Sequence, residues 1–140
     1  MFEPTAKSAI EYAGSNKLEE WVHEFLCGEG NNKKLSDALK IYKREYVGPK
    51  LMDLHLLTRC YGPEPEMECR IPEENQEQTK NFGANIDKIA KRFKTGGWDM
   101  PPLLALDCNG KFEIDDGNHR YEALKKLGIK KYWVILSCRV

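Results

Sequence analysis

Residues 115–124 read Asp-Asp-Gly-Asn-His-Arg-Tyr-Glu-Ala-Leu, and this stretch predicts a turn that joins a strand to a helix. A strand is expected to end at Ile114, Gly117 lies in the turn, and a helix is expected from about His119 to Leu127. The first backbone N–H groups of such a helix have no partner within the helix, so they point into the turn. Together with the positive end of the helix dipole they favour a bound anion. The stretch therefore predicts a phosphate-binding loop.

The side chains of this loop suit the same chemistry. Gly117 lets the backbone approach a ligand closely because it has no Cβ. Arg120 can hold phosphate oxygens with two parallel hydrogen bonds, and His119 can donate a hydrogen bond or move a proton near neutral pH. Asp115 and Asp116 can orient His119 or hold Mg²⁺ beside a nucleotide. An Asp before a helix is also typical of a plain N-cap, so the residues alone leave a phosphate site and a purely structural turn equally open.

Alternating short elements surround the loop. A helix is expected over residues 85–94, since Ile86, Ile89, Ala90 and Phe93 fall on one face, and Gly96-Gly97 ends it. Residues 98–102 predict a turn into a strand over 103–106, and Asp-Cys-Asn-Gly at 107–110 predicts a hairpin. Strands over 111–114 and 132–138 complete the pattern.

The N-terminal part is predicted to be helical. Helices are expected from Thr5 to Gly14, over 18–26, and from a cap at Ser36 through Tyr42 and Tyr46 to Gly48-Pro49. After Pro49, residues 51–57 predict a strand, and residues 61–78 predict a long acidic connection rich in Pro and Glu. We therefore expect a helical segment over 1–48, packed on a core domain over 49–140.

Composition narrows the class of protein. Lys plus Arg equals Asp plus Glu, 22 each, so the formal net charge is zero, and non-specific binding of nucleic acid is disfavoured. The cysteines show neither zinc spacing nor a disulfide framework. Residues 1–7 contain no apolar run typical of a signal peptide, and no apolar run approaches the length of a membrane span. A cytoplasmic protein is expected, without contact to a membrane. The cysteines are Cys27, Cys60, Cys69, Cys108 and Cys138.

Residues 117–123, Gly-Asn-His-Arg-Tyr-Glu-Ala, resemble the Gly-x-(His/Arg)-Arg-x-x-Ala signature of the ParB/sulfiredoxin superfamily. The predicted order of elements over residues 85–137 is similar to that family as well, with residues 51–57 as its first strand. The resemblance implies an α+β fold, a small mixed sheet with packed helices, preceded here by the N-terminal helical segment.

The resemblance also implies a bound nucleotide, ATP, ADP or CTP, together with Mg²⁺. Its phosphates would lie on Gly117, Asn118, His119 and Arg120, and the preceding helix would contribute further contacts. The corresponding helix positions are Asn85, Lys88 and Arg92, which share one face and are equally typical of a solvated charged surface.

Within the superfamily, each activity is distinguished from the others by a particular sequence feature. Sulfiredoxins carry a catalytic Cys directly before the His, where this chain has Asn118, so that chemistry is not expected. Chromosome-partitioning ParB proteins add a helix-turn-helix domain, which we do not expect after Val140. The loop is nearest to that of the free-serine-kinase-like branch, which has Asp-Gly-His-His-Arg where residues 116–120 read Asp-Gly-Asn-His-Arg.

Three functions therefore remain open. The first is a phosphotransferase or nucleotide hydrolase that acts on a small molecule or a protein hydroxyl, with His119 and Asp116 as catalytic groups and Glu68 as a general base. The second is a metal-dependent nuclease, with Asp115, Asp116 and His119 around the metal. The third is a non-catalytic nucleotide sensor that engages a protein partner through its N-terminal helices.

Overall fold

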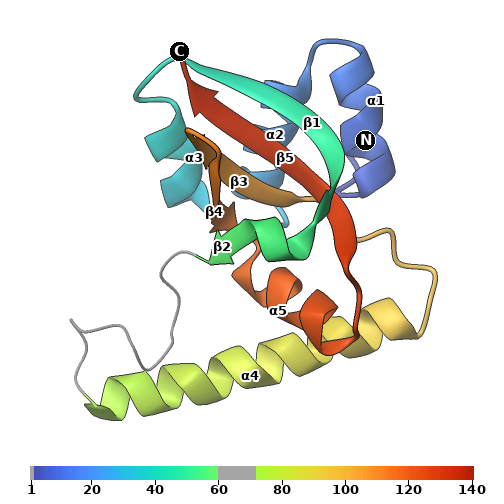
Figure 1. The fold of residues 1–140 in the computed structure, drawn as a ribbon, viewed down its shortest axis with the longest axis vertical. Helices are drawn as coiled ribbons and strands as arrows, with labels where there is room; N and C mark the ends of the chain where they lie inside the picture. The colour runs from blue at the N-terminus through green and yellow to red at the C-terminus, as the bar shows by residue number, and fades with distance from the viewer. Residues whose placement is uncertain (1, 60–71) are drawn as a thin grey trace.

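A five-stranded mixed sheet forms the centre of the protein (Figure 1). The computed structural model describes residues 2–59 and 72–140, and within helix α4 it describes side chains from residue 83 onward. The strand order is β1-β5-β3-β4-β2, with β1/β5 and β3/β4 antiparallel and β3/β5 and β2/β4 parallel. The predicted α+β class with a mixed sheet is thus confirmed. The strands are β1 (Arg44–Asp53), β2 (Leu57–Arg59), β3 (Leu103–Cys108), β4 (Lys111–Asp116) and β5 (Lys131–Arg139).

Helices cover both faces of this sheet. On one face lie α1 (Ala6–Gly14), α2 (Leu18–Cys27) and α3 (Lys33–Leu39), and on the other lie α4 (Pro72–Lys94) and α5 (Asn118–Lys126) (Figure 1). Because successive strand residues point to opposite faces, β3 and β5 supply side chains to both helical layers. No helix among the described residues has the length and apolar character needed to cross a membrane.

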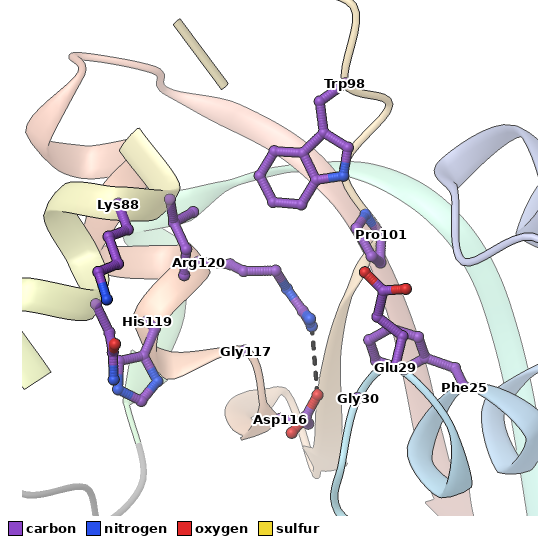
Figure 2. A pocket seen from close by; sticks show the side chains of 12 residues that line it. Phe25, Glu29, Gly30, Lys88, Trp98, Pro101, Asp116, Gly117, His119 and Arg120 are labelled. Carbon is purple, nitrogen blue, oxygen red and sulfur yellow. Dashed lines mark hydrogen bonds and ion pairs between the residues drawn. The ribbon is translucent and has the colours of Figure 1, made fainter. Parts of the chain in front are cut away.

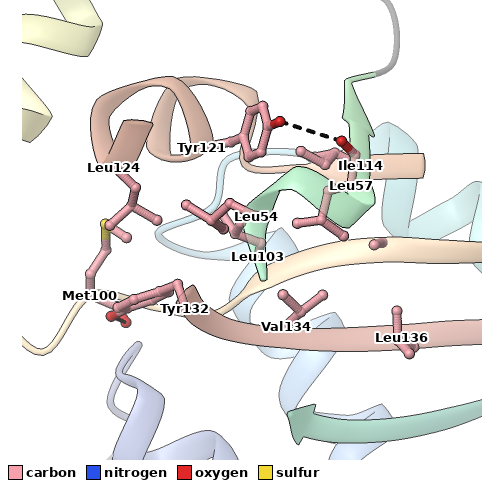
Figure 3. Packing of buried hydrophobic residues seen from close by; sticks show 11 residues of the cluster. Leu54, Leu57, Met100, Leu103, Ile114, Tyr121, Leu124, Tyr132, Val134 and Leu136 are labelled. Atoms are coloured by element: carbon pink, nitrogen blue, oxygen red, sulfur yellow. Dashed lines mark hydrogen bonds between the residues drawn. The ribbon is translucent and has the colours of Figure 1, made fainter. Parts of the chain in front are cut away.

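Two hydrophobic cores result from this alternation. Leu103 and Val134 pack under α5, whereas their neighbours Leu104 and Ile135 pack under α1–α3. Figure 3 shows the core under α5, where the Tyr121 hydroxyl donates a hydrogen bond to the carbonyl oxygen of Leu57 at 3.3 Å. The predicted apolar face of α2 is entirely buried in the other core. Its members are Leu18, Trp21, Val22, Phe25 and Leu26.

The predicted third helix is wrong over most of its length. The helix begins earlier, because the side chain of Asn32 accepts a hydrogen bond from the backbone N–H of Leu35, and it ends at Leu39. Ser36 is not its cap but a buried residue within it. Tyr46 lies in β1, paired with Ser137 of β5, so sheet pairing overrides the helical spacing of the tyrosines.

The expected boundary after residue 48 falls inside β1. Gly48 has a φ of +114°, and the register shifts between Val47 and Lys50, so a bulge accommodates a proline that cannot donate to the strand ladder. The segment 51–57 is likewise not one strand: it ends β1, forms a short 3₁₀ helix at Leu54–Leu56 and begins β2. The division into segments 1–48 and 49–140 stays a prediction.

The predicted acidic connection over 61–78 is partly helical. Helix α4 starts at Pro72 and includes the helix that is expected to begin at residue 85. Proline is compatible with a first helical position, and the Glu, Gln and Lys residues that follow are good helix formers. The rest of the connection, including Glu68, lies outside the described residues.

The remaining turns agree with the sequence. Asn109 and Gly110 have φ angles of +54° and +88°, as a tight hairpin between β3 and β4 requires. Helix α5 begins at Asn118 and ends at Lys126, close to the predicted bounds, and Gly128 follows with a φ of +75°.

Candidate functional site

The strand-to-helix loop has the backbone geometry that the sequence predicts. Gly117 lies between β4 and α5 with a φ of +112°, and its carbonyl oxygen accepts the first helical hydrogen bond, 2.7 Å from the backbone nitrogen of Tyr121. No side chain caps α5, so the N–H groups of the first turn keep their capacity for a ligand. A Cβ on residue 117 would lie 2.8 Å from both Leu103 Cδ2 and Arg120 Nη2. Both the conformation and the space therefore require glycine here.

Arg120 is the buried charge of this loop. Its side chain is 11% exposed, and its Nη2 donates to the carbonyl oxygen of Pro102 at 3.1 Å and to Asp116 Oδ2 at 3.4 Å. The ring of Phe25 lies beneath the guanidinium, 5.2 Å from its central carbon. Burial lowers the pKa of Arg120, and the charge of Asp116 opposes that shift. The Nε of Arg120 is buried without a hydrogen-bond partner among the described residues.

Asp116 holds the loop in place from the other side. One carboxylate oxygen accepts from Arg120, and the other accepts from Asn32 Nδ2 at 3.1 Å. Asn32 precedes α3, so this hydrogen bond joins the N-terminal helices to the loop across the sequence. Both oxygens of Asp116 already have protein donors, which indicates a positioning role.

His119 is half-buried beside the loop. Burial lowers its pKa, Arg59 and Arg120 lower it further, and Asp116 opposes them. The imidazole is therefore neutral at pH 7, with one nitrogen that donates and one that accepts hydrogen bonds. A neutral histidine of this kind can donate to a phosphate oxygen or relay a proton.

These residues line a cleft of about 390 Å³ (Figure 2). That volume lies within the range of small-molecule sites, roughly 300–1,000 Å³. Sequence reasoning missed one wall, because the segment between α2 and α3 joins the cleft only through tertiary packing. The lining consists of Phe25, Glu29 and Gly30 from the N-terminal part, Asn85, Lys88 and Ile89 from α4, Trp98 and Pro101 from the following turn, and Asp116, Gly117, His119 and Arg120 from the loop.

Three of the candidate residues lie elsewhere. Arg92 does not line the cleft but stacks on Trp98, with its guanidinium carbon 3.9 Å from the ring centroid. The side chain of Asn118 does not line it either, and its buried Oδ1 has no hydrogen-bond partner among the described residues. Asp115 lines a separate small cavity with Tyr46 and Ser137. Another candidate, Glu68, is outside the described residues.

Asp115 and Asp116, the expected Mg²⁺ ligands, line different cavities. Burial raises the pKa of Asp115 to about 6, with Arg44 opposing the shift, and its carboxyl group faces a different cavity from that of Asp116. Within the described part of the chain, no cluster of three His, Cys, Asp or Glu side chains could hold a metal ion. The Mg²⁺ site on Asp115 and Asp116 therefore stays a prediction.

Comparison with known proteins adds a structural likeness. No protein family model and no curated protein matches the chain. Among solved structures it is similar to the crystal structure of sulfiredoxin from Arabidopsis thaliana, with 21% sequence identity and a TM-score of 0.41. The match covers 66% of this chain and 83% of the sulfiredoxin chain.

Proposed function

We propose that the protein binds a nucleotide in this cleft and acts as a phosphotransferase or nucleotide hydrolase toward a small-molecule or protein hydroxyl. The observation that carries the proposal is the uncapped N-terminus of α5, which opens beside Lys88, His119 and Arg120 in one cleft. Backbone N–H groups at a helix N-terminus bind phosphate without further help, and cationic side chains beside them strengthen the site.

The charges that line the cleft support an anionic ligand. The charge of Asp116 is balanced by Arg120, and the buried Nε of Arg120 still has no hydrogen-bond partner among the described residues. Lys88 is exposed on α4 and has no ion pair among the described side chains, so its ammonium group is available to phosphate oxygens. In Figure 2, Lys88 and His119 lie on one side of the central space, with Arg120 projecting into it.

The groups needed for phosphoryl transfer are also at hand. The neutral imidazole of His119 can donate to a phosphate oxygen in the transition state. Glu29 lines the opposite wall and supplies a carboxylate that can accept the proton of an acceptor hydroxyl. The role expected for Glu68 stays a prediction. Any Mg²⁺ would enter bound to the phosphates of the nucleotide.

Thermal unfolding with a panel of nucleotides tests the proposal. ADP, ATP and CTP would each be added with and without Mg²⁺, and a ligand at a hundred times its Kd is expected to stabilise the native state by about 2.7 kcal/mol. Lys88→Ala is expected to weaken binding several-fold. Lys91→Ala is the matched control, since Lys91 is exposed on the same helix and does not line the cleft.

The outcomes separate the alternatives. If none of the three nucleotides raises the melting temperature of the wild type, the proposal is refuted. If Lys91→Ala weakens binding as much as Lys88→Ala, the ligand does not occupy this cleft. Turnover of bound ADP or ATP with a panel of hydroxyl acceptors then distinguishes a phosphotransferase or hydrolase from a sensor that only binds.

A further inference from the structure

Trp98 is one of the apolar residues that line the cleft. It is half-buried, packs against the core under α5, and lines the cleft together with Pro101. Arg92 stacks on the indole with its guanidinium carbon 3.9 Å from the ring centroid, and Arg92 itself does not line the cleft. Trp98 therefore borders the cleft while its ring makes a cation–π contact with Arg92.

The cleft is lined by both apolar and cationic side chains. Ile89, Trp98 and Pro101 provide apolar surface, Phe25 lies beneath the Arg120 guanidinium, and Lys88 and Arg120 provide the positive charge. Figure 2 shows Trp98 across the central space from the loop, with the Arg120 side chain between them. An inorganic phosphate or pyrophosphate would use only the loop. A ligand with a flat aromatic part joined to phosphates would use both parts.

We propose that Trp98 is the stacking platform for the base of a nucleotide whose phosphates lie at Gly117–Arg120. This inference rests on the proposed function and adds the source of preference for a nucleoside over plain phosphate. Stacking of a base on an aromatic ring tolerates different bases, because each base has a π face. The platform therefore favours nucleotides as a class.

Binding of ADP, CDP and pyrophosphate to the wild type and to Trp98→Ala tests the platform. The wild type is expected to bind either nucleotide about tenfold more tightly than pyrophosphate, a ratio equivalent to ~1.4 kcal/mol and within the range of base–aromatic stacking. Trp98→Ala is expected to remove that preference while its affinity for pyrophosphate stays within about twofold of the wild type.

Intrinsic fluorescence gives a second readout that does not depend on the alanine variant folding. ADP is expected to quench the wild-type emission, and Trp98→Phe, which retains a packed ring, is expected to lose the quenching. Trp133→Phe is the control: Trp133 also packs against the core under α5 but does not line the cleft, so the quenching should persist.

The results distinguish a failure of the stacking platform from a failure of the proposed function. If the wild type binds pyrophosphate and ADP equally, or if quenching survives in Trp98→Phe, the platform is refuted and the phosphate site stands. If the wild type binds neither ADP, CDP nor pyrophosphate, the proposed function and the platform fail together.

Discussion

Replacing Asn32 with serine is expected to separate the N-terminal helices from the phosphate loop. The side chain of Asn32 makes two hydrogen bonds: Oδ1 caps α3 by accepting from the Leu35 N–H at 3.2 Å, and Nδ2 donates to Asp116 at 3.1 Å. Serine keeps a capping oxygen but is too short to reach Asp116. Alanine removes both interactions.

The expected loss in free energy of unfolding follows from these two hydrogen bonds. A hydrogen bond to a charged group contributes about 1.5–3 kcal/mol. The Asp116 side chain is 15% exposed, so water recovers part of that energy, and about 1–2 kcal/mol is expected for Asn32→Ser. Loss of an N-cap costs about 1 kcal/mol more, so about 2–3 kcal/mol is expected for Asn32→Ala.

Urea unfolding measures this contact directly when it is applied to Asn32→Ser, Asn32→Ala and Asp116→Asn. The fourth protein is the double variant that combines Asn32→Ser with Asp116→Asn. Because the two side chains touch, the double variant should lose less free energy of unfolding than the sum of the single changes, by about 1 kcal/mol. Asn32→Ser should also weaken ADP binding, because Asp116 orients Arg120. If the losses of the two single variants add up to the loss of the double variant within about 0.3 kcal/mol, Asn32 does not hold the loop.

Two further changes probe the loop and the cavity behind it. Gly117→Ala is expected to destabilise the protein by about 1–3 kcal/mol more than Gly110→Ala: both glycines have a positive φ, but only a Cβ at Gly117 would crowd Leu103 and Arg120, and equal losses in urea would contradict this. Asp115→Asn is expected to become more stable relative to the wild type as pH rises from about 4 to about 6, by up to ~3 kcal/mol at ~1.36 kcal/mol per pKa unit. The reason is that the native state holds the proton of Asp115 up to a pKa of about 6, so ionisation costs stability within that window and the cost is constant above it. Urea unfolding of both proteins across this pH range measures the difference, and a constant difference would show that Asp115 ionises without penalty.

Secondary structure was predictable from the sequence where a local signal decided it. The five apolar positions of α2 fall on one face and are all buried, since helix periodicity alone selects that face. Tyr42 and Tyr46 show the limit of such spacing. Their separation fits a helix, yet Tyr46 belongs to β1 because β5 offers it a long antiparallel partner. No local pattern contains that information.

The candidate site divides in the same way. The sequence by itself determined the loop at Gly117, because a positive φ and a strand-to-helix turn are local properties of the chain. Only the tertiary structure decided which distant residues lie beside this loop. Glu29 and Asn32 reach the loop from more than 80 residues away, and Asp115 turns into a different cavity from Asp116. Such contacts depend on how α2 and α3 pack on the sheet, and that packing is set by both cores at once rather than by neighbouring residues.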